Sequence, residues 1–205
     1  MGRFDTSRRM VELMILAGIV LIGLVALPGS SEAASPAAAV GVSIAGDGTF
    51  RVGKDIKPGT YVSSAASSFG GYWERLSCAT GDLECVLANA NVKGQSFVTI
   101  LPSDKFFSSS RMKPWKRAGS VEPVRPAKRF AGDGMFRVGV DIAPGTYKST
   151  SSGSGSGYWQ RSSCATGVLD CVLANDNVDG QAFVEILPTD KFFTTNRMKA
   201  WSKVG

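Results

Sequence analysis

The sequence predicts an all-β protein built from two small tandem domains, and three observations carry this prediction. The chain has 205 residues, its two halves repeat each other, and its apolar residues occur in short runs between turn-forming residues. No stretch keeps the spacing of three and four residues that a long amphipathic helix requires. We therefore expect two tandem β-sandwich or barrel domains, each with an intra-domain disulfide, after an N-terminal signal or anchor helix.

The repeat becomes evident when the sequence is shifted against itself by 86 positions. Residues 45–119 then align with residues 131–205, and 49 of the 75 aligned pairs are identical. Such self-similarity indicates a tandem duplication. We place repeat 1 at 45–119, a basic, proline-containing linker at 120–130, and repeat 2 at 131–205.

The first 44 residues precede the repeats and have the order of an export segment. Arg3, Arg8 and Arg9 come before an apolar stretch at 10–27, and small residues follow around Ala33. This order predicts a signal peptide at 1–33, followed by an Ala/Ser/Pro-rich spacer at 34–44. The alternative is an uncleaved membrane anchor, although the apolar run is shorter than the roughly 20 residues of a comfortable spanning helix. Both interpretations place the repeats outside the cytoplasm.

Six short strands are expected in repeat 1, in the order of its apolar runs and turns. We place them at 50–52, 60–62, 72–76, 85–88, 96–101 and 105–109. Turns are expected at Pro58-Gly59 and at 89–94, and Trp115 is expected to plug one end of the domain. Repeat 2 carries the same pattern 86 residues later. A domain of this size buries only about 60% of the surface that its unfolded chain exposes. It therefore needs additional stabilisation, such as a covalent cross-link.

The four cysteines are predicted to supply this stabilisation as disulfide bonds. Cys78 and Cys85 in repeat 1, and Cys164 and Cys171 in repeat 2, share the spacing C-x6-C. In an exported chain, this spacing favours one bridge within each repeat. A metal site or a redox pair is the alternative, but such sites favour tighter spacings such as C-x2-C.

Several motifs recur in both repeats. In order, they are G-x-F-x-V-G-x-D-I-x-P-G-T-Y, Y-W-x-R, A-N-x-N-V-x-G-Q, D-K-F-F and a final Trp. Together they resemble a group of small exported actinobacterial proteins of unknown function. The resemblance spans both repeats and implies export, and it brings no established ligand or catalytic residue. Relatives in that group often have a cysteine before the Tyr-Trp pair, where this chain has Gly71 and Gly157.

The Y-W-x-R motif supplies the candidate ligand-binding residues. They are Tyr72, Trp73 and Arg75 in repeat 1, and Tyr158, Trp159 and Arg161 in repeat 2. Neighbouring strand residues point to opposite faces, so one aromatic side chain of each pair should face outward and could stack on a sugar or a partner. The arginine lies on the same face as the tryptophan and could pair with an acidic ligand. The alternative is that both rings are covered and the arginine is simply solvated.

Composition argues against catalysis. The chain has no histidine, which excludes Ser-His-Asp and Cys-His catalysis and the histidine-containing zinc sites. The aspartates are scattered at the starts of turns, where they cap backbone N–H groups, and they do not form one calcium loop. A domain this small also offers little room for a substrate cleft. We expect no enzyme activity, no catalytic residue, no metal and no cofactor.

The charge distribution bears on the choice of partner. The net charge is +6, and the excess lies in repeat 1 and the linker, whereas repeat 2 is balanced. This asymmetry suits an anionic cell-wall polymer or lipid headgroups, although a merely soluble basic surface explains it equally well. No nucleic-acid motif is present, and a membrane would be contacted only through the N-terminal segment, if that segment is uncleaved.

We expect an exported binding or interaction module of the cell envelope. Two weak sites on one tether gain avidity, which benefits a binder of polymers or surface proteins. The alternatives are a structural envelope protein without a small ligand and a secreted protease inhibitor, because small disulfide-braced domains often have that role.

Overall fold

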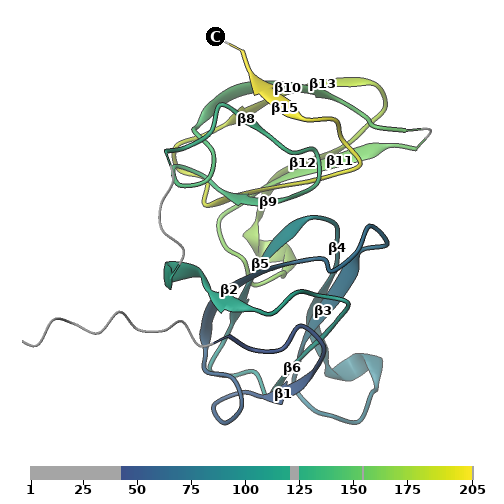
Figure 1. Cartoon of the computed structure of the whole chain (residues 1–205), viewed down its shortest axis with the longest axis vertical. Helices are drawn as coiled ribbons and strands as arrows, with labels where there is room; N and C mark the ends of the chain where they lie inside the picture. The colour runs from purple at the N-terminus through teal and green to yellow at the C-terminus, as the bar shows by residue number, and fades with distance from the viewer. Residues whose placement is uncertain (1–42, 121–124, 154, 205) are drawn as a thin grey trace, which may run out of the picture. The chain divides into compact units, whose positions relative to one another are not determined.

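The computed structural model describes residues 43–120, 125–153 and 155–204, and these residues form an all-β protein (Figure 1). Each repeat consists of two antiparallel sheets around its own apolar core, and each contains one disulfide. The predicted fold class is therefore confirmed. The predictions for the export segment at 1–33 and for nearly all of the spacer concern residues outside those described.

Repeat 1 has a four-stranded and a three-stranded sheet. The first sheet has the order β1-β6-β3-β4 and the second the order β5-β2-β7. The strand bounds are β1 (Gly48–Arg51), β2 (Gly59–Ser64), β3 (Gly71–Leu76), β4 (Val86–Val92), β5 (Gln95–Ile100), β6 (Phe106–Ser110) and β7 (Lys116–Arg117). A 3-10 turn, η1 (Leu83–Cys85), precedes β4.

Repeat 2 has the same plan with one additional strand. Its sheets have the orders β9-β14-β11-β12 and β13-β10-β15-β8. The strand bounds are β8 (Arg129–Phe130), β9 (Gly134–Arg137), β10 (Gly145–Thr150), β11 (Gly157–Ser162), β12 (Val172–Val178), β13 (Gln181–Ile186), β14 (Phe192–Asn196) and β15 (Trp201–Lys203), and the 3-10 turn η3 (Leu169–Cys171) precedes β12.

Strand β4 is longer than its sequence suggested. We expected a strand at 85–88 and a turn at 89–94, but the strand continues to Val92. Ala88 and Val92 are buried while Asn89 and Asn91 are exposed, so the period of two persists through the asparagines. The turn is shorter and reverses the chain around Gly94, whose positive φ of 70° suits a glycine.

The region expected as the linker also contains ordered structure. A 3-10 turn, η2 (Ala118–Ser120), follows β7, and β8 pairs with β15 of repeat 2. Phe130 is buried among the aromatic residues of the second core, 5.1 Å from the Tyr147 ring and 5.7 Å from the Phe193 ring. The chain therefore enters the core of repeat 2 before residue 131.

The recurring motifs have structural explanations. In P-G-T-Y, Tyr61 is buried and its hydroxyl donates to the Lys57 carbonyl at 2.7 Å, which ties the turn to the strand. The spacing of Arg51 and Asp55, which recurs in repeat 2, allows these side chains to form an ion pair at 2.8 Å across the preceding turn. The final tryptophan, Trp115, is fully buried, and its Nε1 donates to Ser109 Oγ at 3.0 Å.

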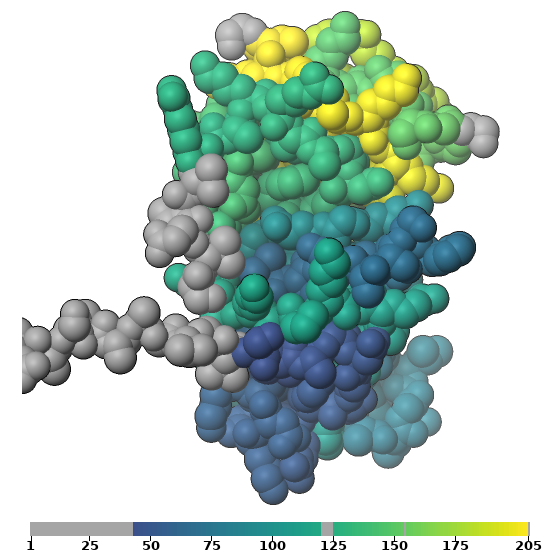
Figure 2. Space-filling view, in the orientation of Figure 1, coloured from purple at the N-terminus to yellow at the C-terminus, as the bar shows by residue number. Residues whose placement is uncertain are grey.

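The two repeats touch along strands β5 and β9, which lie side by side (Figure 1). Figure 2 shows the side chains of repeat 1 and repeat 2 meeting along this boundary. Strand β5 is an edge strand of its sheet, so it would expose unpaired backbone groups if repeat 2 did not cover it. This contact brings the candidate functional residues of both repeats together.

Candidate functional site

The Tyr-Trp pair of repeat 1 lies in β3 with the tryptophan facing the core. Trp73 is 3% exposed, and its Nε1 donates to Ser96 Oγ at 3.1 Å. Tyr72 points to the opposite face and is half-buried, and its hydroxyl donates to Glu74 Oε2 at 2.9 Å. Burial and this hydrogen bond to a carboxylate raise the pKa of Tyr72 to about 12. Alternation therefore places one ring inside and one outside, as the strand geometry predicted.

Arg75 is not a solvated arginine. Its side chain is 3% exposed and forms a two-pronged ion pair with Asp104, with Nε–Oδ2 at 2.7 Å and a second N–O distance of 2.8 Å. The remaining guanidinium nitrogen donates to the Thr166 carbonyl of repeat 2 at 2.6 Å. The simpler interpretation of a solvated side chain is wrong here, because Asp104 closes a turn in the core where only a paired charge is tolerated.

The counterparts in repeat 2 are less covered. Trp159 is half-buried and stacks on Phe193 with ring centroids 6.3 Å apart. Arg161 pairs with Asp190 at 2.7 Å, but its side chain is 18% exposed. The hydrogen bond to Asp190 raises the pKa of Arg161 above its usual value. The same motif therefore has a more open environment in repeat 2.

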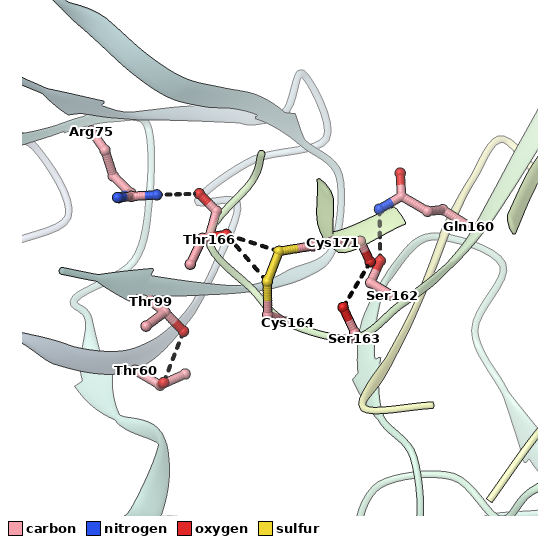
Figure 3. The surroundings of a disulfide bond; sticks show 9 residues. All are labelled: Thr60, Arg75, Thr99, Gln160, Ser162, Ser163, Cys164, Thr166 and Cys171. Carbon is pink, nitrogen blue, oxygen red and sulfur yellow. Dashed lines mark hydrogen bonds between the residues drawn. A yellow bond between two sulfur atoms is a disulfide. The ribbon is translucent and has the colours of Figure 1, made fainter. Parts of the chain in front are cut away.

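Both predicted disulfides are present. Cys78 is bonded to Cys85 and Cys164 to Cys171, each pair with Cα atoms 5.3 Å apart. In repeat 2, the Thr166 hydroxyl contacts both sulfur atoms of the bridge, at 3.3 Å from the Cys164 Sγ and 2.9 Å from the Cys171 Sγ (Figure 3). The bridge and this threonine brace the loop at residues 164–171, which we call loop 2; loop 1 is its counterpart at residues 78–85.

Loop 2 docks onto repeat 1. The Thr99 N–H donates to the Ala165 carbonyl at 2.8 Å, next to the bond from Arg75 to the Thr166 carbonyl (Figure 3). Gly167 lies so close to repeat 1 that a Cβ atom on it would stand 2.7 Å from the Trp73 ring. We call the receiving surface slot 1; it is formed by Trp73, Arg75, Ala88, Phe97 and Thr99.

Phe97 is the apolar centre of the contact between the repeats. Its side chain is 2% exposed and clusters with Ala165, and its ring lies 5.5 Å from the Phe192 ring. The Arg137 guanidinium lies over the same ring at 5.3 Å from its centroid. Beside it, Gln95 Nε2 donates to the Met135 carbonyl at 3.0 Å. Hydrophobic burial, a cation–π contact and backbone hydrogen bonds thus all hold repeat 2 on β5.

A pocket of about 270 Å³ lies where the repeats meet. Its polar lining comes from β4 and β5 on one side and from β11 and β14 on the other: Asn89, Asn91, Gln95, Tyr158, Gln160 and Asn196. Trp73, the bridge of loop 2 and apolar side chains such as Phe97 and Met135 are also part of the lining. Of the six residues that we singled out as ligand-binding candidates, the pocket brings together Trp73 and Tyr158.

A row of polar groups runs along the repeat 2 side of the pocket. The Tyr158 hydroxyl donates to Gln160 Oε1 at 2.7 Å, and Gln160 Nε2 donates to Ser162 Oγ at 2.7 Å. Burial raises the pKa of Tyr158, so its hydroxyl stays protonated at neutral pH. Asn196 Oδ1 is buried and, among the described residues, accepts no hydrogen bond. A buried acceptor without a partner is costly, and a donor from a ligand or water would satisfy it.

Sequence reasoning missed most of the amide groups of this pocket. In the sequence, Asn89, Asn91 and Gln95 have an ordinary explanation as turn residues. In the structure they lie in strands β4 and β5, and their side chains line the pocket. Gln160 and Asn196 stand where repeat 1 has Glu74 and Ser110. A comparison of the residues that differ between the repeats is the one sequence signal that points to them.

The fold and disulfides define a class of protein, namely a tandem-repeat extracellular β protein. The chain belongs to the family described as the Rv1352-like extracellular domain, whose model matches residues 42–116 and 128–202. No curated protein and no solved structure matches the chain. The two repeats are therefore extracellular domains of an exported protein. Within the described residues, no helix is long and apolar enough to cross a membrane.

Proposed function

We propose that this protein is an exported binding module and that the pocket between its repeats takes a hydroxyl-rich ligand, such as a sugar unit of an envelope polysaccharide. The observation that carries the proposal is the buried Asn196 Oδ1, which accepts no hydrogen bond among the described residues and belongs to a side chain of a pocket that also contains several amides and hydroxyls. A ligand hydroxyl can donate to this oxygen and accept from a neighbouring amide at the same time.

The lining chemistry favours sugars over charged or purely apolar ligands. Carboxamide side chains donate and accept in one plane, which matches neighbouring sugar hydroxyls, and the face of an aromatic ring attracts sugar C–H groups. The volume of about 270 Å³ lies just below the usual range of pockets for drug-sized molecules, about 300–1,000 Å³. The pocket therefore suits one residue of a polymer better than a large free ligand.

The same lining favours binding over catalysis. Among the described residues that form the pocket, none is Asp or Glu, and Lys93 is the one charged side chain. Glycoside hydrolysis commonly uses a pair of carboxyl groups on either side of the bond that is cleaved. A pocket that is rich in amides and has no carboxyl group among these residues supports recognition of a sugar and does not supply that pair.

Cosedimentation of the exported protein with purified cell wall and insoluble polysaccharides tests the proposal. The pocket variants are Asn196→Leu, which removes the unpartnered acceptor at similar size, and Asn89→Ala. The matched control is Asn175→Ala, because Asn175 is the exposed counterpart of Asn89 in repeat 2 and lies outside the pocket. Each pocket variant should weaken binding about tenfold, while the control binds like the natural protein.

The salt dependence separates this site from a basic surface. Binding through neutral amides should change little between low and moderate salt, because screening acts on charges. Binding that survives in both pocket variants but disappears with salt would place the site on the basic surface of repeat 1. That result, or no binding to any of these polymers, would contradict the proposal.

A further inference from the structure

The described part of the chain contains one docking contact between its repeats, that of loop 2 in slot 1. Each repeat nevertheless has both a disulfide loop and a slot. Loop 2 occupies slot 1, as described above. Repeat 1 has its own disulfide loop, loop 1, and repeat 2 has its own slot. This second surface, slot 2, consists of Trp159, Arg161, Ala174, Phe183 and Glu185, the counterparts of the residues of slot 1.

Slot 2 is uncovered among the described residues. Phe183 is 56% exposed, whereas its counterpart Phe97 is 2% exposed. Both phenylalanines lie on edge strands, β13 and β5, with the same pairing register to the neighbouring strand. Glu185 therefore presents its N–H away from β10 in the way that Thr99 presents the N–H bonded to Ala165. An exposed edge strand with a large apolar side chain is a template for a partner.

Loop 1, like slot 2, is exposed and available for a docking contact. It has the same Cys-Ala-Thr-Gly start as loop 2, and the Thr80 hydroxyl contacts the Cys85 Sγ at 3.1 Å, so it has the same internal brace. Ala79 is exposed, whereas its counterpart Ala165 is 3% exposed in the docked loop. Loop 1 thus presents the docking surface of loop 2 to solvent.

We propose that slot 2 of one molecule receives loop 1 of a second copy, so that the protein associates head to tail. The occupant follows from the contact inside the chain: four of the five residues of slot 1 recur in slot 2, and loop 1 repeats the docking residues of loop 2. The two surfaces of the new contact lie on different repeats. The interface is therefore heterologous and extends into a chain or closes into a ring, instead of forming a symmetric dimer.

The charge differences between the repeats partly fit this pairing. Loop 1 carries Asp82 where loop 2 has Val168, and slot 2 has Lys148 beside its phenylalanine where Val62 stands in repeat 1. The Lys148 Nζ lies over the Phe183 ring at 5.6 Å from its centroid, within reach of an acidic loop. Glu185 in place of Thr99 adds a negative charge that opposes the contact.

The contact between molecules should be weaker than the one inside the chain. A tether supplies an effective concentration in the mM range to the docking of loop 2, and two separate molecules lack it. Thr49 also stands where Met135 contacts repeat 1, which removes apolar area from the loop 1 side. Association is therefore expected at high local concentration, as on a surface that already binds the protein.

Sedimentation velocity of the exported protein over a concentration series up to about 1 mM tests this proposal. The slot variant is Phe183→Asp and the loop variant is Ala79→Arg; both residues are exposed, so neither change disturbs a core. The matched control is Phe69→Asp, because Phe69 is another exposed phenylalanine that belongs to neither surface. We expect association that each variant weakens by at least about tenfold and that the control retains.

Mixing the two variants gives the sharpest result. Phe183→Asp keeps an intact loop 1 and Ala79→Arg keeps an intact slot 2, so an equimolar mixture should form dimers that cannot grow further. A natural protein that stays monomeric over the whole series would overturn the proposal. So would association that Phe183→Asp leaves unchanged, or a mixture that fails to dimerise.

Discussion

Single substitutions between two otherwise similar repeats create the chemical differences of the site. Repeat 1 has Glu74 where repeat 2 has Gln160. In each repeat, the tyrosine two residues earlier donates a hydrogen bond to this side chain. The Glu74 carboxylate accepts a hydrogen bond from Tyr72 outside the pocket, whereas the Gln160 amide lines the pocket and donates to Ser162. The strand β11 side of the pocket is therefore neutral where the matching position of repeat 1 carries a charge.

The pKa of Tyr72 tests this difference. Burial and the bond to Glu74 raise it to about 12. Because the folded-state pKa exceeds the unfolded value of about 10, the neutral phenol stabilises the fold below pH 10, and this contribution is lost as the pH rises through 12. A spectrophotometric titration of tyrosinate should show a group near pH 12 that Tyr72→Phe removes and Glu74→Gln shifts downward. Burial also raises the pKa values of Tyr147 and Tyr158, so these two variants identify the Tyr72 signal. Ionisation of Tyr72 near its ordinary pKa would contradict this.

Arg75 should matter more for stability than Arg161. Replacing Arg75 with Met leaves Asp104 buried without its partner, which costs about 3–5 kcal/mol, and also removes the bond to Thr166. Arg161→Met is the matched control, and its cost should be smaller because water reaches the Arg161 side chain. Urea denaturation gives both free energies of unfolding. Equal losses in the free energy of unfolding would show that the burial of Arg75 adds nothing to the stability of the protein.

At the scale of elements, the two disulfide loops have similar sequences and different contacts. Loop 2 fills slot 1, whereas loop 1 faces solvent. The bridge itself was predictable from the C-x6-C spacing in an exported chain. The docking was not predictable, because the Cys-Ala-Thr-Gly start of the loop and four of the five slot residues are the same in the two repeats. The sequence of each half therefore does not show which loop meets which slot.

Glycines at the same place in the two loops provide a matched test of docking. Gly167 and Gly81 have positive φ angles of 78° and 83°, so replacement by Ala strains both by about 1–2 kcal/mol. A Cβ atom at Gly167 would also meet the Trp73 ring, whereas one at Gly81 meets nothing within 4 Å. Gly167→Ala should therefore cost about 1–3 kcal/mol more than Gly81→Ala in urea denaturation. Equal costs would mean that loop 2 does not rest on Trp73.

The strands show how far the sequence determines the fold. Short apolar runs and Pro-Gly turns predicted six of the seven strands of repeat 1, because alternation and turn chemistry are local, and only the two-residue strand β7 was missed. The length of β4 was missed, since asparagines on the outward face of a strand look like turn residues until their buried neighbours are known. Phe130 was placed in the linker for a similar reason, because its burial depends on residues far along the chain.

At the scale of the whole chain, duplication produces a site that neither repeat has alone. The pocket takes Asn89 and Trp73 from one repeat and Tyr158 and Asn196 from the other. The family match describes each repeat as an extracellular domain, and the pocket depends on both. The unpartnered oxygen of Asn196 could not be predicted from the sequence, because the burial and hydrogen bonding of a side chain depend on residues far along the chain.

A fluorescence titration of the exported protein with soluble cell-wall oligosaccharides tests most directly whether the docked repeats form one binding site. Trp73 lines the pocket, so a bound ligand should change its emission. We predict saturable binding by the natural protein and by Gly81→Ala, and binding at least about tenfold weaker by Gly167→Ala, which disturbs the docked loop. Equal binding by Gly167→Ala and Gly81→Ala would contradict a site that depends on docking.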